Sequence, residues 1–470
     1  MPGSLTPAYV VGVASRLSVQ AMSFAQIMIA SRFLDLSEFG VYALAWAVAV
    51  IFNTFLFTGY YHALLRSQDF EADRDTTFWV IATLGACGAI VLGGIGLAIG
   101  GGPGAIGTTF LLLAGFPLLR APTSWNEAIL LRRRRVRTVS TYVVVGEILA
   151  TTVVYLGLKA GLGIPALVLG RYVAAGSDLV LTTLLVRCRP VFHFDRAAIL
   201  RGWNTARPLW IASGVGMFSN YGADLILGAF LNPAAVGAYR GGARMSQTVA
   251  DLVMQPIEML SWSRFSRLEK EGKSAELREA WLQTIALGAA SVWPILLSFA
   301  LFAEDIVSLI FADIWGPVAP ILVIMSGARA IYFLSILLEP TMVCRDRGRA
   351  QLLTRGFGAI VLLVSLLAFG RNNGEAAAYA YGLTALTVAV ISMWLMMAEL
   401  GISLLRVLRA FVPAVTITLL CLAVTLATVD VRAMMGQLPA FVASVAVLAT
   451  LWAGSIALFI RFRLLVLPTS

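Results

Sequence analysis

The feature that most constrains the fold is a series of apolar runs, each about 20 residues long, along the whole chain. A run of this length crosses the hydrocarbon of a bilayer as an α-helix. The sequence therefore predicts an all-α, polytopic membrane protein of about 14 transmembrane helices. The expected spans are residues 9–32, 39–63, 78–100, 108–131, 138–158, 163–186, 208–231, 236–260, 281–303, 317–342, 353–370, 375–398, 411–429 and 438–460.

Composition argues against a soluble protein. Hydrophobic residues make up 59% of the 470 residues and charged residues only 13%, whereas a soluble domain carries about 25% charged residues. The four cysteines and two histidines have no spacing typical of a disulfide framework or a zinc site, so we expect no metal centre.

The net charge of +10 is explained by where the basic residues fall. With both termini cytoplasmic, 25 of the 35 lysines and arginines lie in cytoplasmic segments, which is the bias of the positive-inside rule. The run from Arg132 to Arg135 is then a stop signal at the membrane surface, and no nucleic-acid partner is expected. Two inner segments are longer. Residues 192–207 predict an interfacial amphipathic helix before Pro208, and residues 264–280 a charged cytosolic helix.

A ten-residue stretch from Phe33 to Tyr42 returns without a gap at Phe230 to Tyr239. Phe, Leu, Gly and Tyr recur at the same places, and Asp35 corresponds to Asn232. Each copy predicts a short polar turn between two spans, with a glycine that lets the next helix start tightly packed. The repeat predicts two related halves. The expected divisions are residues 1–190, a cytoplasmic interfacial linker at 191–207, residues 208–400, and two additional spans in 401–470.

Charged residues within the expected spans are the best pointers to function. An arginine or aspartate at the bilayer centre costs about 2.5–3.5 kcal/mol on insertion scales, and such residues persist where they pair or line a cavity. The intramembrane arginines are Arg16, Arg120, Arg171, Arg240, Arg244 and Arg329. The intramembrane acids are Glu127, Glu147, Asp178, Asp224, Asp251, Glu258 and Glu339.

Span 236–260 carries a polar stripe along almost its whole length. At 100° per residue its polar side chains fall within an arc of roughly 80°. Such a stripe cannot face lipid, so it must face a wet cavity or another polar helix. The stripe consists of Arg240, Arg244, Gln247, Asp251, Gln255 and Glu258. In span 208–231, Ser213, Asn220 and Asp224 align in the same way.

One interpretation is that these charges are buried ion pairs that hold helices in register. In span 163–186, Arg171 and Asp178 are an expected pair at i,i+7. Depth argues against pairing as the whole explanation, because several acids lie near the cytoplasmic ends while the arginines lie central or outward. The sequence therefore predicts a cationic cavity, which favours an anionic passenger such as a phosphate group.

The stretch Ala30–Leu34 leading into Glu38–Tyr42 resembles the first hairpin of bacterial polysaccharide flippases. So does Asp224–Gly228 leading into Val236–Tyr239, followed by Pro256 and the helix at Ser266–Leu268. These flippases are the O-antigen and exopolysaccharide (Wzx-type) members of the multidrug/oligosaccharidyl-lipid/polysaccharide exporter (MOP) superfamily. The resemblance covers nearly the full length in span count and repeat layout.

The resemblance implies two six-helix bundles around a central cavity plus two extra C-terminal helices. It also implies a non-enzymatic flippase that moves an undecaprenyl-diphosphate-linked oligosaccharide (an O-antigen, capsule or exopolysaccharide repeat unit) across the bacterial inner membrane by alternating access. The expected partners are this lipid-linked oligosaccharide and the phospholipid bilayer, with a glycan polymerase and export machinery as further candidates. No cofactor is expected, and coupling to H⁺ or Na⁺ is a candidate energy source.

The site hypothesis follows from the intramembrane charges. The candidate substrate-binding residues are Arg240, Arg244, Arg329, Arg16, Arg120, Gln247 and Asn220. The candidate coupling or orienting residues are Asp224, Asp251, Glu147 and Glu258, and no catalytic residue is expected.

The sequence leaves three alternatives open. A lipid II flippase and a cation-coupled drug antiporter share the fold, although the antiporter needs an acidic cavity with few basic residues. A membrane-embedded glycan polymerase or transferase is the alternative from another class. It needs a large outer loop or clustered carboxylates, whereas the longest outer loop, residues 304–316, offers only Glu304, Asp305 and Asp313 and is interpreted as an interfacial cap.

Overall fold

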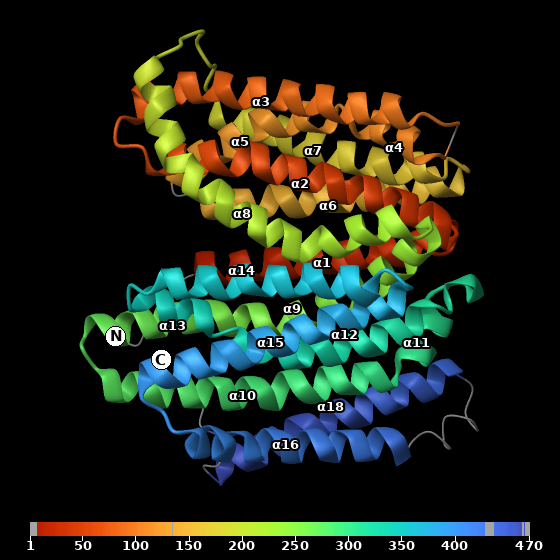
Figure 1. Cartoon of the computed structure of the whole chain (residues 1–470), viewed down its shortest axis with the longest axis vertical. Coiled ribbons are helices and arrows are strands. Elements are labelled where there is room, and N and C mark those ends of the chain that lie inside the picture. Colours follow the sequence, from red (N-terminus) through yellow and green to blue (C-terminus); the bar gives the residue numbers. More distant parts are fainter. Residues whose placement is uncertain (1–6, 103, 134, 428–436, 463–464, 466–470) are drawn as a thin grey trace. The chain divides into compact units, whose positions relative to one another are not determined.

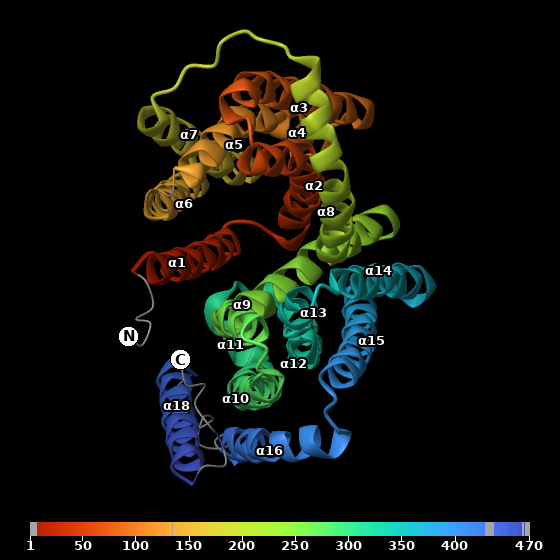
Figure 2. The same cartoon turned by 90° about the vertical axis from the view of Figure 1, so that its left-hand side faces the viewer.

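The computed structural model describes residues 7–102, 104–133, 135–427, 437–462 and 465 (Figure 1). Throughout these ranges the chain forms helices and turns and no strand. Contacts divide it into two compact units, one ending at Arg240 and the other beginning at Gly241. Figure 2 shows the same helices after a turn of 90° about the vertical axis.

The helices of the first unit are α1 (Pro7–Ala30), α2 (Leu36–Arg66), α3 (Phe70–Ile99), α4 (Ile106–Leu113), α5 (Phe116–Arg132), α6 (Val136–Lys159), α7 (Ile164–Val186), α8 (Arg196–Phe230) and the first turns of α9 (Pro233–Lys270). The second unit contains the rest of α9 and then α10 (Ser274–Leu301), α11 (Ala303–Ile310), α12 (Val318–Tyr332), α13 (Leu338–Cys344), α14 (Gly348–Ser365), α15 (Gly374–Leu400), α16 (Leu404–Ala427) and α18 (Gln437–Arg461).

Helices occupy all fourteen expected spans, which confirms the all-α membrane class. Within the described residues, eleven helices are long and apolar enough to cross a membrane. Helix α1 adds a shorter apolar helix at Leu17–Ala30, and α8 adds one at Tyr221–Phe230. Helix α9 is not among the eleven, and it is the helix that carries the polar stripe. The count of fourteen spans stays a prediction.

Two inner segments predicted as separate helices are parts of longer ones. Residues 196–207 are the first turns of α8, which continues without a break to Phe230 and packs against α2. The expected helix at 264–280 is wrong as a unit: its residues are the end of α9 and the start of α10. The turn between them contains Gly272, whose φ of 69° suits a glycine that ends a helix.

Two expected spans are interrupted. Span 108–131 divides into α4 and α5, and Pro117 stands in the first turn of α5, where its missing N–H costs nothing. Span 317–342 divides into α12 and α13, with a 3₁₀ turn at Phe333–Ser335 between them.

The boundary between the two units lies inside α9, at Arg240 and Gly241, whereas the repeat predicts a junction at 191–207. The reason is that α8 lies along α2 for much of its length, so it belongs to the first unit by contact (Figure 1). The predicted division into residues 1–190, 191–207, 208–400 and 401–470 stays a prediction about the repeat.

The two copies of the repeated stretch form equivalent helix starts, as predicted. Asp35 accepts a hydrogen bond from the backbone N–H of Glu38, at 2.8 Å. Asn232 accepts one from the backbone N–H of Ala235, again three residues on, at 2.9 Å. Each side chain therefore caps the helix that follows it, as short polar residues do at helix starts.

The glycines of the two copies lie against each other. A Cβ added to Gly40 in α2 would stand 1.7 Å from the carbonyl oxygen of Pro233, and one added to Gly237 in α9 would stand 2.1 Å from that of Leu36. In each case the carbonyl belongs to the residue four positions before the partner glycine. The repeat therefore builds a nearly symmetric helix crossing that only glycine permits.

Candidate functional site

The polar stripe of α9 stays partly covered along its length. All six of its side chains are half-buried, whereas Leu252 and Leu260 of the same helix are exposed. Arg240 of the stripe belongs to the first unit, and the five later residues, from Arg244 to Glu258, belong to the second.

In the first unit, Arg240 forms an ion pair with Asp224 of α8. The distance from Arg240 Nη1 to Asp224 Oδ2 is 3.0 Å, and Asp224 is 0% exposed. The guanidinium carbon also lies 4.5 Å from the ring centroid of Tyr221, within the range of a cation–π interaction. The second carboxylate oxygen, Asp224 Oδ1, is buried and has no hydrogen-bond partner in the described structure. Both of these partners of Arg240, Asp224 and Tyr221, thus lie in its own unit. Asp224 has one oxygen without a hydrogen-bond partner in the described structure.

In the second unit, Asp251 interacts with three other predicted site residues, Arg244, Gln247 and Arg329, and with Gln255 of the stripe. Its carboxylate interacts with the guanidinium groups of Arg329 and Arg244 and accepts hydrogen bonds from the side chains of Gln247 and Gln255. Among the described side chains, no other predicted site residue interacts with as many of the others.

In Arg329 of α12, the Nε–H group lacks an acceptor among the described residues. Its guanidinium carbon lies 5.0 Å from the ring centroid of Tyr381 in α15. Its Nε–H is buried and, among the described residues, donates to no acceptor. A buried donor without an acceptor costs free energy unless a ligand or water satisfies it. The Arg329 Nε–H is therefore available to an anion.

The predicted pair of Arg171 and Asp178 is wrong. Arg171 Nε donates to the Tyr42 hydroxyl at 2.9 Å, with its guanidinium over the Trp46 ring. Asp178 instead pairs with Arg120 of α5, at 3.5 Å. Seven residues span about 10.5 Å along a helix, too far for a direct contact between side chains on one helix.

The remaining predicted carboxylates lie elsewhere. Glu147 accepts a hydrogen bond of 3.2 Å from Gln26 of α1. Glu258, together with Glu339 and Arg355, lines a cavity of about 90 Å³ in the second unit. Glu339 and Arg355 form an ion pair there. The side chains of Arg16 and Asn220 lie outside the described part of the structure.

Sequence reasoning missed the aromatic rings that hold the arginines. Trp46, Tyr221 and Tyr381 each lie under a guanidinium group. A partial signal was present, because Tyr42, which accepts from Arg171, is a residue of the repeated stretch. Nothing in the sequence shows which ring meets which arginine, since the partners come from different helices.

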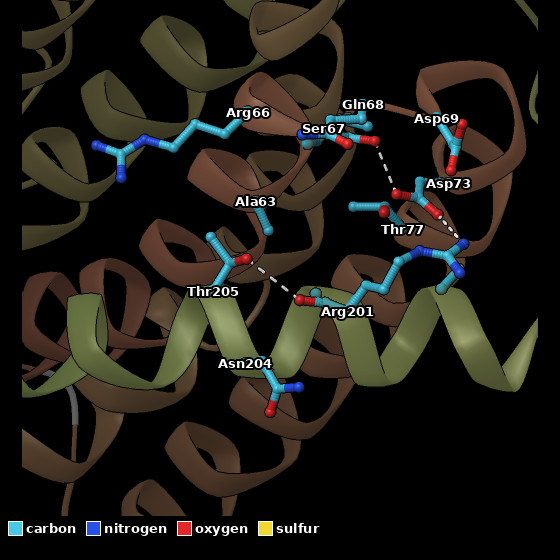
Figure 3. Close-up of a pocket in the computed structure, with 13 residues that line it drawn as sticks. Ala63, Arg66, Ser67, Gln68, Asp69, Asp73, Thr77, Arg201, Asn204 and Thr205 are labelled. Carbon is cyan, nitrogen blue, oxygen red and sulfur yellow. Dashed lines mark hydrogen bonds and ion pairs between the residues drawn. The ribbon is translucent and has the colours of Figure 1, made fainter.

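A separate polar cavity of about 360 Å³ lies in the first unit, between the end of α2, the start of α3 and the start of α8 (Figure 3). Its central contact joins Arg201 Nη2 to Asp73 Oδ1 at 2.6 Å, and Ser67 donates to the other oxygen of Asp73. None of the predicted site residues lines it. Among the described residues, no group of three or more histidines, cysteines, aspartates or glutamates is placed to hold a metal ion.

Solved structures show which fold this is. The chain is similar to the lipid II flippase MurJ in an inward closed conformation, with a TM-score of 0.79 and 8% identity over 96% of this chain and 99% of that one. It is also similar to a multidrug resistance MATE family transporter of the MOP superfamily in an inward-facing conformation, with a TM-score of 0.65 and 13% identity over 83% and 98% of the two chains. A MOP superfamily transporter from Pyrococcus furiosus matches with a TM-score of 0.58 and 13% identity over 84% and 96%.

The helical arrangement therefore defines a multi-pass membrane protein with the fold of the MOP superfamily transporters. A family model described as "Polysaccharide biosynthesis protein" matches residues 29–320, and the chain belongs to this family. No curated protein sequence matches the chain. The resemblance found in the sequence is confirmed for family and fold.

Proposed function

We propose that the protein is a flippase that moves an undecaprenyl-diphosphate-linked oligosaccharide across the bacterial inner membrane by alternating access, with both termini in the cytoplasm. The family supports a role in polysaccharide biosynthesis, and the fold is one that carries lipid-linked and other cargo in the proteins it resembles. The substrate would be an O-antigen, capsule or exopolysaccharide repeat unit.

The observation that carries this proposal is the cluster around Asp251. Asp251 of the second unit interacts electrostatically with both Arg244 and Arg329, and the Arg329 Nε–H has no protein acceptor in the described structure. Guanidinium groups match phosphate oxygens in geometry and charge, and a buried donor without an acceptor favours such a ligand. Asp251 would orient the two arginines, and the diphosphate would supply the missing acceptor.

Asp224 is the candidate for coupling to H⁺ or Na⁺. Among the described residues its second oxygen is buried without a hydrogen-bond partner, and a proton or cation bound there would weaken the ion pair with Arg240. Glycan polymerase and export machinery remain proposed partners, and no cofactor is proposed.

Replacing Arg329 with glutamine tests the cluster. We expect export of the glycan in cells to fall about tenfold or more, since a hydrogen bond to a charged group contributes roughly 1.5–3 kcal/mol. Arg244→Gln should act in the same direction. The measurement is the amount of glycan at the cell surface, normalised to the amount of folded protein in the membrane.

Arg409→Gln is the matched control, because Arg409 is an exposed arginine of α16 outside the cluster. It should leave export unchanged. Normal export by the Arg329→Gln and Arg244→Gln variants, at equal protein levels, would show that these arginines do not bind the substrate.

A further inference from the structure

Residues 187–207, here called the basic segment, combine five arginines with a single acid, Asp195. Asp195 is fully used at the start of α8, where its carboxylate accepts from the backbone N–H groups of Ala197 and Ala198. These bonds lower the pKa of the Asp195 carboxyl. Arg201 forms ion pairs with Asp73 and Asp195. In the described structure, the other four arginines of the segment are exposed and form no ion pair with a protein carboxylate. Those arginines are Arg187, Arg189, Arg196 and Arg207.

One side of the basic segment contacts α3 of the same unit. Figure 3 shows Arg201 reaching across to Asp73 of α3, while Thr205 bonds back to the Arg201 carbonyl. Upstream, Trp79 and Thr76 of α3 donate hydrogen bonds of 2.9 and 3.2 Å to the backbone carbonyls of Val191 and His193. Figure 2 shows the chain between α7 and α8 arching past α3 before α8 begins. These contacts hold the segment against α3, so its other side faces away from that helix.

That opposite side is amphipathic. Arg196, Leu200, Trp203 and Arg207 follow one another at spacings of four, three and four residues, which places them on one face of α8. Leu200 is 53% exposed and Trp203 47%, and an arginine stands at each end. Just before the helix, Phe192 is 74% exposed. About three turns of helix thus present an apolar centre between two arginines that, among the described residues, form no ion pair with a carboxylate.

The membrane interface is the environment that matches this face. Tryptophan and arginine are favoured there, because the ring lies at headgroup depth while the guanidinium reaches phosphate. Arg207 immediately precedes the expected span 208–231, so the face lies within a few turns of the bilayer. The excess of arginines favours lipids with a net negative charge over zwitterionic ones.

We infer that the basic segment is a binding surface for the headgroups of anionic phospholipids in the cytoplasmic leaflet, with Arg196 and Arg207 as the lipid-binding arginines. The inference uses the proposed orientation of the chain and does not depend on which substrate is carried. Bound lipid would hold the start of α8 at the membrane surface.

The test uses the full-length protein purified in a neutral detergent. Phosphatidylglycerol or phosphatidylcholine is added, and the bound lipid is counted by native mass spectrometry. We expect phosphatidylglycerol to bind more tightly than phosphatidylcholine. In Arg196→Gln/Arg207→Gln its affinity should fall about fivefold for each arginine removed, the contribution of a basic residue near an anionic surface.

The matched control is Arg278→Gln/Arg349→Gln, which removes two exposed arginines from other cytoplasmic segments. It should keep the affinity for phosphatidylglycerol. Unchanged Tm values without added lipid establish that both variants fold. An equal loss in the control, or no loss in Arg196→Gln/Arg207→Gln, would overturn the inference. So would inorganic phosphate that raises the Tm of the unmodified protein as much as phosphatidylglycerol does, because the site would then bind a free anion.

Discussion

Replacing Arg240 with alanine should lower the free energy of unfolding by about 3–5 kcal/mol, because it leaves a carboxylate buried without its cation. Asp224 is 0% exposed, and its other oxygen already lacks a partner in the described structure. The loss is measured by denaturant unfolding in detergent micelles. Adding Asp224→Asn to the Arg240→Ala variant should restore much of the stability, since the uncompensated charge is then removed.

Arg120→Ala is the matched control for this prediction. Arg120 is also an intramembrane arginine paired with an aspartate, but its side chain is 31% exposed and its pairing distance is 3.5 Å. Its removal should cost clearly less than that of Arg240. If Arg240→Ala is as stable as the unmodified protein, or if Asp224→Asn does not restore the stability of the double variant, the Arg240–Asp224 pair does not stabilise the fold.

Adding a methyl group to Gly40 should be comparably severe. The new Cβ would overlap the backbone carbonyl of Pro233, which cannot move like a side chain. Overpacking of this kind costs typically 1–3 kcal/mol and sometimes more, and we expect about 3 kcal/mol or more for Gly40→Ala. Gly237→Ala should behave alike, because its Cβ would meet the carbonyl of Leu36. Thermal unfolding of the single variants measures both effects.

Gly94→Ala in α3 provides the comparison, since nothing lies within 4 Å of a Cβ at that position. It should leave the stability unchanged or raise it slightly, because alanine favours helix more than glycine. Equal Tm values for the Gly40→Ala and Gly94→Ala variants would contradict the close crossing of α2 and α9.

Much of the fold could be predicted because its signals are local. A run of about 20 apolar residues identifies a span without knowledge of its neighbours, and every expected span contains a helix. The repeated stretch was also informative by itself: the correspondence of Asp35 to Asn232 predicted two equivalent turns, and both residues cap a helix. That the two glycines meet could not be predicted, since neither copy specifies its neighbour.

The arrangement of the site depended on contacts between distant residues. Periodicity placed Arg244, Gln247 and Asp251 on one face of α9, and the structure groups them. It could not show that Arg329, from α12, joins them. The same limit explains the error at Arg171 and Asp178, where a pattern within one helix was preferred to partners on α2 and α5. Periodicity along a helix gives the face but not the neighbouring helix.

The most direct test of the proposed function is transport by the purified protein alone. Proteoliposomes containing the protein, and empty liposomes as the control, are loaded with a labelled polyprenyl-diphosphate-linked oligosaccharide, and its movement between leaflets is followed. We expect translocation well above that of the empty liposomes, and its loss in the Arg329→Gln variant. No translocation above the control by the folded protein, or translocation of lipid II with none of the oligosaccharide, would contradict it.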